Sequence, residues 1–304
     1  MALIIDKNNT LTAIRDPMVC LVRDTYYVTG SQPPYWNGIN EGVHLWSTKD
    51  FNAFTDHGLI LKRSDLSEDA WCRDRFWAPE LFDGKNGYYY LTFNCRNESE
   101  KYSHPHHVGL ACSQNITGPY EIITLEKPVT YEYSSANDAT LFRDDDGTVY
   151  IGYTALKEST DSDNKYHLWI SKIDLDTGRI YDHIDVCTLG DDGEWDHIGV
   201  EGQCIVKRHG KYFQWYSSWT RGYEAGILTA DNISGPWKKY DNNPILVDNE
   251  KRHKAGHNHS FTAMDGKDYI TFHANPIDPN AKSIESFFIE PVEYTEDGNV
   301  IIKD

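Results

Sequence analysis

The hydrophobic positions of this chain fall in short runs that repeat along its whole length. Each repeat has a polar residue, a short apolar run, a charged or glycine-containing turn and then an apolar run rich in aromatic residues. Runs rich in Tyr, Val, Ile and Trp that alternate with Asp-Gly, Asn-Gly and Gly-Lys turns are typical of β-hairpins. The five segments are RDPMVCLVRDTYYVTG from Arg15, PELFDGKNGYYYLTF from Pro79, NDATLFRDDDGTVYIGY from Asn137, EGQCIVKRHGKYFQWYS from Glu201 and NHSFTAMDGKDYITFHA from Asn258.

The leading polar residues of these repeats recur about 60 residues apart, which indicates a repeat architecture. We take them to be Asp16, Glu80, Asp138, Glu201 and either Asn258 or His259. A second hairpin pattern alternates with the first, so that each period holds two hairpins. It reads LWSTKDFNAFTDHG from Leu45, LACSQNITGPYEII from Leu110, LWISKIDLDTGRIY from Leu168 and ILTADNISGPWKKY from Ile227.

Four strands in each of five units predict an all-β fold, a five-bladed β-propeller formed by residues 1–304 as a single domain. No segment has a sustained apolar period of 3.6, so we expect very little helix. A β-sandwich followed by a second β domain is the alternative, but it leaves the full-length period unexplained. Short apolar segments at residues 2–6 and 299–304 are expected to pair in one blade and close the ring.

Charge and cysteine usage restrict the partners and the compartment. The 304 residues include 47 Asp and Glu against 29 Lys and Arg, a net charge of -18. Such a chain repels phosphate backbones and anionic lipids, so we expect no nucleic-acid or membrane partner. The six cysteines are scattered, and the first residues lack a secretory signal, which together favour a cytoplasmic protein with reduced thiols. A processed mature chain would have the same features.

Three carboxylates are expected to meet at the mouth of the channel. Asp16, Asp138 and Glu201 lead the first, third and fourth repeats, and the inner strands of a propeller all begin at the same face. A cluster of carboxylates needs a positive charge, a shared proton or a function. Glycoside hydrolysis uses two carboxyl groups, one as acid and one as base. Taken singly, each of the three is better explained as a polar cap of a strand-end turn, whereas all three in register favour a function.

Five motifs in order resemble the signatures of glycoside hydrolase family 43. They are RDP at Arg15, WAPE at Trp77, NDATLFRDDDG at Asn137, EG at Glu201 and GHNHSF at Gly256. The family contains five-bladed propellers that act as inverting α-L-arabinofuranosidases, β-xylosidases, arabinanases and galactan-active enzymes. The resemblance implies that Asp16 is the general base, that Glu201 is the general acid, and that Asp138 modulates the pKa of Glu201 and orients it.

The activity that this resemblance implies is release of terminal α-L-arabinofuranose from oligosaccharides derived from arabinoxylan, arabinan or xylan. A β-xylosidase or a bifunctional enzyme is the nearest alternative, followed by an enzyme that acts on galactans or galactofuranosides. A carbohydrate-binding propeller without catalysis and a metal-dependent enzyme built on histidine-rich loops are alternatives of other classes. No cofactor is expected to be required for catalysis.

Aromatic and histidine residues are candidates for holding the sugar. Trp77 and Trp36 could stack on the C–H face of a sugar ring, or else pack in the core. The resemblance implies that His257 lies near the axis and helps to bind a calcium ion or an ordered water molecule, with His259 taking this place if the register differs by two. Many family members carry an arginine in the last blade, which KSIESFFIEPVEY lacks. Arg221 or Arg252 could replace it, and Lys282 less well.

Three further polar segments are expected to be structural. SHPHH at residues 103–107 lacks the spacing of a metal site and is interpreted as a solvated loop. DSDNKY at residues 161–166 lacks the Gly and the distal Glu of a calcium loop. Asp144, Asp145 and Asp146 precede Gly147 between two strands and are expected to form a hairpin turn, which leaves Asp138 as the functional aspartate of that repeat.

Overall fold

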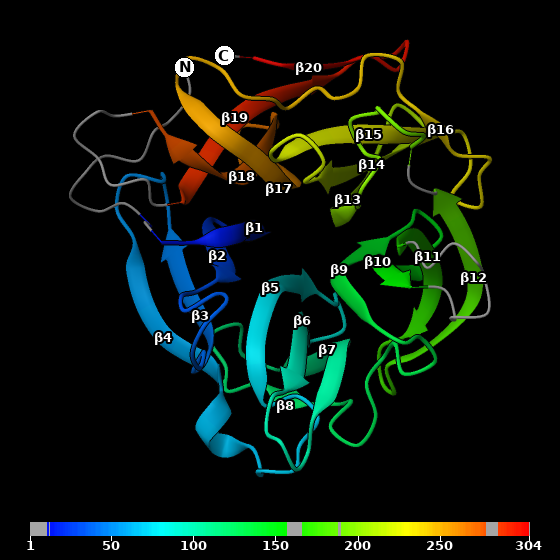
Figure 1. The fold of residues 1–304 in the computed structure, drawn as a ribbon. Helices are drawn as coiled ribbons and strands as arrows, with labels where there is room; N and C mark the ends of the chain where they lie inside the picture. Colours follow the sequence, from blue (N-terminus) through cyan, green and yellow to red (C-terminus); the bar gives the residue numbers. More distant parts are fainter. Residues whose placement is uncertain (1–10, 12, 157–165, 188–189, 278–284, 304) are drawn as a thin grey trace.

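The computed structural model describes residues 11, 13–156, 166–187, 190–277 and 285–303, and these form a five-bladed β-propeller. Five four-stranded antiparallel sheets stand around a common centre (Figure 1). The predicted fold is therefore confirmed. Within the described ranges the helical structure is one 3-10 turn, Arg63–Asp65, and no helix is long and apolar enough to cross a membrane.

The strands follow the chain from the centre outwards in every blade. The first blade consists of β1 (Arg15–Val22), β2 (Thr25–Ser31), β3 (Gly42–Thr48) and β4 (Thr55–Lys62). The second consists of β5 (Asp74–Asp83), β6 (Tyr89–Asn97), β7 (His104–Ser113) and β8 (Glu121–Ile122). The third consists of β9 (Ala136–Arg143), β10 (Val149–Leu156), β11 (Tyr166–Asp174) and β12 (Arg179–Cys187). The fourth consists of β13 (Glu201–Arg208), β14 (Lys211–Ser218), β15 (Glu224–Ala230) and β16 (Lys238–Lys239). The fifth consists of β17 (Arg252–Thr262), β18 (Asp268–Pro276), β19 (Ser286–Tyr294) and β20 (Val300–Ile302).

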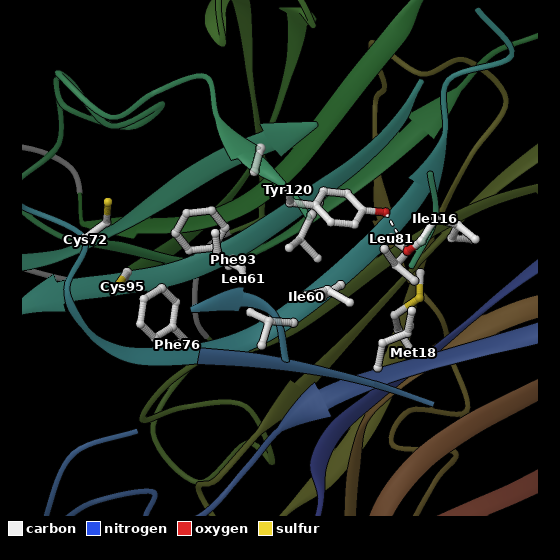
Figure 2. Close-up of a cluster of buried hydrophobic side chains, with 14 of the residues drawn as sticks. Met18, Ile60, Leu61, Cys72, Phe76, Leu81, Phe93, Cys95, Ile116 and Tyr120 are labelled. Carbon is white, nitrogen blue, oxygen red and sulfur yellow. Dashed lines mark hydrogen bonds between the residues drawn. The ribbon is translucent and has the colours of Figure 1, made fainter. Parts of the chain in front are cut away.

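The core consists of apolar layers between neighbouring blades. Figure 2 shows the layer in which Met18 and Ile60 of the first blade pack against Phe76, Leu81 and Phe93 of the second. Nearly every position of a strand buried on both faces is buried and most are apolar or aromatic, and β10 and β14 have this character. This explains why the sequence shows continuous aromatic-rich runs where a half-exposed strand would alternate. Each fully buried Phe or Leu contributes about 2 kcal/mol to the free energy of folding.

The ring closes between the fifth blade and the first. Val19 and Val28 of the first blade pack with Phe261 and Phe287 of the fifth in one buried cluster. The backbone N–H of Phe287 also donates to the carbonyl of Leu11 at 3.2 Å, which ties the segment before β1 to β19. At the other end, β20 pairs with β19. Its expected partner, residues 2–6, lies outside the described residues, so that pairing stays a prediction.

The innermost strand of each blade has a β-bulge towards its N-terminal end, and this bulge determines which side chains face the channel mouth. The register against the second strand shifts there in all five blades. One residue in each shift has a positive φ, a left-handed conformation that costs a non-glycine residue about 1–2 kcal/mol. These residues are Asp16 (53°), Ala78 (42°), Asp138 (55°), Gly202 (65°) and His257 (48°), and β5 and β17 each have a further shift, at Arg75 (62°) and Lys254 (55°).

This pattern corrects the alignment of repeats made from the sequence. Asp16 and Asp138 do occupy equivalent positions, but Glu201 lies one residue before its equivalent position, which belongs to Gly202. Glu80 lies two residues after Ala78, and His259 two after His257. The expected leading residues of the second and fifth repeats were therefore wrong by one or two residues, and that of the fourth repeat by one. A spacing of about 60 residues locates the blades but does not resolve a shift of one or two residues within a bulge.

Candidate functional site

A pocket of about 220 Å³ opens at the channel mouth where the five irregularities meet. Its lining includes all three predicted carboxylates, Asp16, Asp138 and Glu201, together with Arg15 and His257. These residues come from the inner strands of the first, third, fourth and fifth blades. Residues far apart in the sequence thus form one pocket, and its volume suits a small ligand such as one sugar ring.

Asp16 is buried and held as a carboxylate. Ser31 Oγ donates to its Oδ2 at 2.5 Å, and His257 Nδ1 lies 3.1 Å from its Oδ1. Its backbone N–H donates to His273 Nδ1 at 3.1 Å. Burial raises the pKa of Asp16, but the neighbouring His257 and Arg15 cations outweigh burial and hold it well below its usual range. Asp16 therefore stays ionised and can accept a proton.

Glu201 is held in the opposite protonation state. Its side chain accepts a hydrogen bond from the hydroxyl of Tyr223 at Oε1, at 2.5 Å. Burial, followed by the negative charge of Asp138, raises the pKa of Glu201 to about 7. A large fraction of Glu201 is thus protonated at neutral pH, and it can donate a proton to a group in the pocket.

Asp138 is joined to the backbone beside Glu201. Asn94 Nδ2 donates to its Oδ1 at 2.7 Å, and the backbone N–H of Gly202 donates to its Oδ2 at 3.0 Å. Asn94 Oδ1 in turn accepts from the N–H of Asp138 at 2.8 Å. Burial raises the pKa of Asp138. Through Gly202, Asp138 fixes the backbone next to Glu201, besides placing a charge near it.

His257 supplies the positive charge that the three carboxylates need. Its Nδ1 lies 3.1 Å from Asp16 Oδ1 and 3.7 Å from Asp138 Oδ2. Burial lowers the pKa of His257, but the charges of Asp16 and Asp138 outweigh this and raise it to about 10. The imidazole is therefore protonated at neutral pH, and Nδ1 is a donor.

A protonated imidazole does not fit the expected calcium site. Nδ1 of His257 faces Asp16 as a donor, so a metal ion could be bound only through Nε2, and only after the imidazole had lost its second proton. In the part of the chain that the structure describes, no group of three or more His, Cys, Asp and Glu side chains is arranged to hold a metal ion. The donor set around His257 thus fits an ion pair with Asp16 better than a calcium ion.

Aromatic side chains form one wall of the pocket. The indole of Trp77 stacks on the imidazole of His106, with ring centroids 4.6 Å apart and planes 15° apart. Trp36 meets Trp77 edge-on at 5.2 Å and is 61% exposed, so it lies on the rim. Both tryptophans line the pocket, as the sequence predicted, and an indole face suits the C–H face of a sugar. Trp219, which is 38% exposed, also lines the pocket.

Comparison with known proteins decides the family. Residues 8–300 match the model of the glycosyl hydrolases family 43. The chain belongs to this family. The predicted resemblance is therefore confirmed over nearly the whole chain, and the protein is a family 43 glycoside hydrolase.

Curated relatives of this family 43 enzyme differ in the activities that their names state. The β-D-galactofuranosidase xynD of Aspergillus niger is 25% identical over 94% of this chain and 81% of its own length. The xylosidase/arabinosidase 43B of Humicola insolens is 24% identical over 84% of this chain, but the match spans only 46% of that relative. The extracellular exo-α-(1→5)-L-arabinofuranosidase ArbA of Cellvibrio japonicus is 21% identical over 86% of this chain and 78% of its own length.

Solved structures share the fold of this family 43 enzyme. A thermostable family-43 glycoside hydrolase superposes with a TM-score of 0.82 and 26% identity, covering 100% of this chain and 96% of that chain. The α-L-arabinofuranosidase of Lactobacillus brevis superposes with a TM-score of 0.73 and 18% identity, covering 96% of this chain and 94% of that one. At that identity the second likeness concerns the fold alone.

The arginine that lines the pocket of this family 43 enzyme is not one of the two candidates predicted from the sequence. Arg221 is about half exposed, pairs with Glu224 at 3.1 Å and does not line the pocket. Arg252 is buried in an ion pair with Glu290. The third candidate, Lys282, lies outside the described residues.

Arg15 lines the pocket instead. It donates to Glu285 Oε1 at 2.5 Å, and its Cζ lies 5.3 Å from the ring centroid of Trp36. Neighbouring residues of a regular strand point to opposite faces, so a site role for Asp16 argues against one for Arg15. The bulge at the start of β1 breaks this alternation, and both side chains reach the pocket.

The segment SHPHH is not a solvated loop, so that prediction was wrong. His104 begins β7, His106 lines the pocket, and His107 is buried with Nδ1 at 3.0 Å from the carbonyl oxygen of Thr130. Burial lowers the pKa of His106 to about 3 and that of His107 to about 4, so both are neutral. No feature of the sequence indicated that His106 stacks on Trp77, because His106 lies on β7, two strands away from the WAPE motif on β5.

The other two polar segments have different outcomes. Of DSDNKY, residues 161–165 lie outside the described residues, whereas Tyr166 begins β11 and lines the pocket. The aspartates at 144–146 form the expected turn between β9 and β10, in which the backbone N–H of Gly147 donates to the carbonyl of Asp144 at 3.0 Å. Lys207 Nζ also pairs with Asp144 at 2.8 Å, which ties this turn to the fourth blade.

Proposed function

We propose that this family 43 enzyme is an inverting, exo-acting hydrolase that removes terminal α-L-arabinofuranose from oligosaccharides derived from arabinan, arabinoxylan or xylan. The observation that carries the proposal is the contrast between two carboxyl groups in one pocket. The pKa of Asp16 lies well below its usual range, while that of Glu201 is raised to about 7. Two carboxyl groups whose environments separate their pKa values are what acid–base hydrolysis of a glycoside requires.

In this mechanism Asp16 takes a proton from a water molecule, which attacks the anomeric carbon. Glu201 gives its proton to the glycosidic oxygen as the bond to the leaving group breaks, so the anomeric configuration inverts in one step. Asp138 keeps the pKa of Glu201 high and fixes the adjacent backbone through the N–H of Gly202. His257 keeps Asp16 ionised. Exchange of protons with solvent then restores both groups.

The size and lining of the pocket support exo action on a single terminal sugar. The cavity of about 220 Å³ is bounded by the Trp77–His106 stack and by Trp36 at the rim. The relatives named as arabinofuranosidase and xylosidase/arabinosidase support a pentose. The relative named as a galactofuranosidase, at 25% identity, supports galactofuranose as the second candidate.

A panel of 4-nitrophenyl glycosides tests this proposal. The α-L-arabinofuranoside, β-D-xyloside and β-D-galactofuranoside are assayed with the wild type, with Glu201→Ala and with Glu224→Ala as a control in the same blade outside the pocket. We expect the wild type to act fastest on the arabinofuranoside, with no loss of rate in EDTA. Glu201→Ala should lose 10²- to 10⁴-fold on that substrate, whereas Glu224→Ala should keep its rate. Release of nitrophenol from none of the three would contradict the proposal.

A further inference from the structure

Tyr223 is a buried residue in direct contact with Glu201, and the mechanism above gives it no role. It immediately precedes β15 and is 7% exposed. Its hydroxyl donates to Oε1 of Glu201 at 2.5 Å. A tyrosine hydroxyl that is buried against a carboxyl group holds that group in one orientation, because its hydrogen bond is directional.

Three other elements hold the ring of Tyr223 in place. The ring stacks on His273 of β18 with centroids 5.1 Å apart and planes 29° apart. The guanidinium carbon of Arg15 lies 5.7 Å from the ring centroid. On β17, Gly256 leaves room for the ring, since a Cβ at that position would lie 2.5 Å from Cδ1 of Tyr223. The hydroxyl is therefore aimed at Glu201 by contacts from the first and fifth blades.

The charges around the pair keep the tyrosine proton on its oxygen. Burial, followed by the charge of Glu201, raises the pKa of Tyr223 well above its usual value, although Arg15 opposes this. Asp16 and Asp138 also face Tyr223, and both raise its pKa. The stacked His273 is neutral, because burial and then Arg15 lower its pKa well below the usual value. Tyr223 thus acts only as a donor to Glu201.

The charges that face Glu201 itself are of both signs. Asp138 and Asp16 raise its pKa, and His257 lowers it. Arg15 is a fourth neighbour, whose own pKa is raised in part by Glu201. Against this background the hydroxyl of Tyr223 favours the ionised form of Glu201, since a donor binds a carboxylate more strongly than a carboxylic acid.

We infer that Tyr223 is a positioning residue for the acid step: it holds Glu201 by Oε1 so that Oε2 is free to face the glycosidic oxygen, and it stabilises the carboxylate that remains after the proton has left. This inference rests on the proposed function. The proton passes from Glu201 to the leaving oxygen, and Tyr223 keeps its own. Its contribution should therefore grow with the need of the leaving group for a proton.

The test compares two substrates with the same sugar and different leaving groups. One is a 2,4-dinitrophenyl glycoside, whose leaving group needs no proton, and the other is a disaccharide, whose leaving group does. Tyr223→Phe should lose about 10-fold in kcat/KM on the disaccharide, the effect of one hydrogen bond to a charged group. It should lose less than about 2-fold on the dinitrophenyl glycoside. The alkaline limb of its pH profile should move to higher pH, because a donor that lowered the pKa of Glu201 is gone.

Tyr216→Phe is the matched control. Tyr216 is also buried in the fourth blade and donates to a carboxylate, Asp196 Oδ2, at 2.8 Å, but it does not line the pocket. Its loss should affect both substrates equally and leave the pH profile in place. Should Tyr223→Phe fold poorly, 3-fluorotyrosine at position 223 is a second test. It is a stronger donor, so the alkaline limb should move to lower pH.

Two outcomes separate this inference from the proposed function. If Tyr223→Phe slows both substrates equally and the pH profile does not move, Tyr223 has only a structural role and the inference is wrong. If Glu201→Ala itself slows both substrates equally, then Glu201 is not the acid and the proposed function fails. An unmoved alkaline limb with 3-fluorotyrosine would likewise overturn the inference.

Discussion

Asp16 and Glu201 line the same pocket and hold their protons with very different strengths. Asp16 is buried and Glu201 is partly buried, and loss of solvent alone would raise both pKa values. The difference comes from their partners: Asp16 is next to the His257 cation, while the negative charge of Asp138 acts more strongly on Glu201 than His257 does, and the hydrogen-bond donor to Glu201 is the neutral Tyr223. At the residue scale, function therefore depends on one buried positive charge placed closer to the base than to the acid.

The pH dependence of the rate follows from these two groups. The plot of kcat/KM for a disaccharide substrate should fall about tenfold per pH unit above about pH 7, where the coupled pair of Glu201 and Asp138 loses its proton. The acid limb should lie below pH 3.8, the ordinary pKa of an aspartate, because that of Asp16 is lowered. A rate that stays constant up to pH 9 would show that Glu201 does not act as the acid.

His257 also gives the fold a pH dependence. Its pKa is raised from the ordinary 6.5 to about 10 in the folded protein, so its ion pair with Asp16 stabilises the fold fully below pH 6.5 and loses that effect as the pH rises through 10. His257→Gln should therefore be less stable than the wild type at pH 6, by a margin that shrinks towards pH 10. Urea unfolding at several pH values measures this margin. A margin independent of pH would mean that His257 is neutral in the folded protein.

At the scale of the elements, the five bulges at the inner ends of the inner strands build the site. Each places a residue with positive φ at the channel mouth, and three of these, Asp16, Asp138 and His257, form the charged cluster. The fourth, Gly202, donates its backbone N–H to Asp138, and it has no side chain that would crowd His257. The bulge is the local structure that lets the side chains of two consecutive residues, such as Arg15 and Asp16, line the same pocket.

Replacing Gly202 tests the role of the bulge. In Gly202→Ala a Cβ would lie 3.0 Å from Cα and Cγ of His257, in addition to the cost of a positive φ of 65°. Gly210→Ala is the control, since Gly210 has a φ of 76° in a hairpin turn with no atom within 4 Å of the added Cβ. Both variants should lose about 1 kcal/mol of stability from the backbone alone. Only Gly202→Ala should also lose activity, by tenfold or more, and equal activities would contradict the account.

The sequence predicted the blades better than the site. Alternating hairpins with a constant period specify the strands, and the three carboxylates all reach the pocket. The exact register was not predictable, because a bulge changes which residues face the channel without changing the apolar pattern on either side. Arg15 was missed for this reason, and His106 because it stacks on Trp77 of β5, two strands away in the same blade, a contact that the local sequence does not contain.

At the scale of the whole molecule, the site depends on closure of the ring. The pocket takes residues from all five blades, and its neutral sugar ligand suits a protein with a net charge of -18. The first and fifth blades are joined by a buried cluster of apolar side chains and by backbone hydrogen bonds from the segment before β1 to β19. Opening this junction would separate Asp16 on β1 from His257 on β17.

Phe287 tests the junction. It is 1% exposed and stacks on Phe51 of the first blade with centroids 6.1 Å apart. Phe287→Ala should reduce the free energy of unfolding by about 3–5 kcal/mol through the cavity that it leaves, with loss of activity at the same urea concentration as loss of structure. Ile301→Ala should have little effect, because Ile301 is 46% exposed at the middle of β20. Activity that survives after the tertiary signal is lost would show that the site does not need a closed ring.

The central claim is that Asp16 and Glu201 act together as base and acid in a single displacement. Proton NMR of the first sugar released from the best substrate of the panel tests this most directly, because a single displacement and a double displacement give opposite anomers. The account predicts that the first-formed sugar has the inverted configuration and then equilibrates. A first-formed sugar with the configuration of the substrate would contradict it.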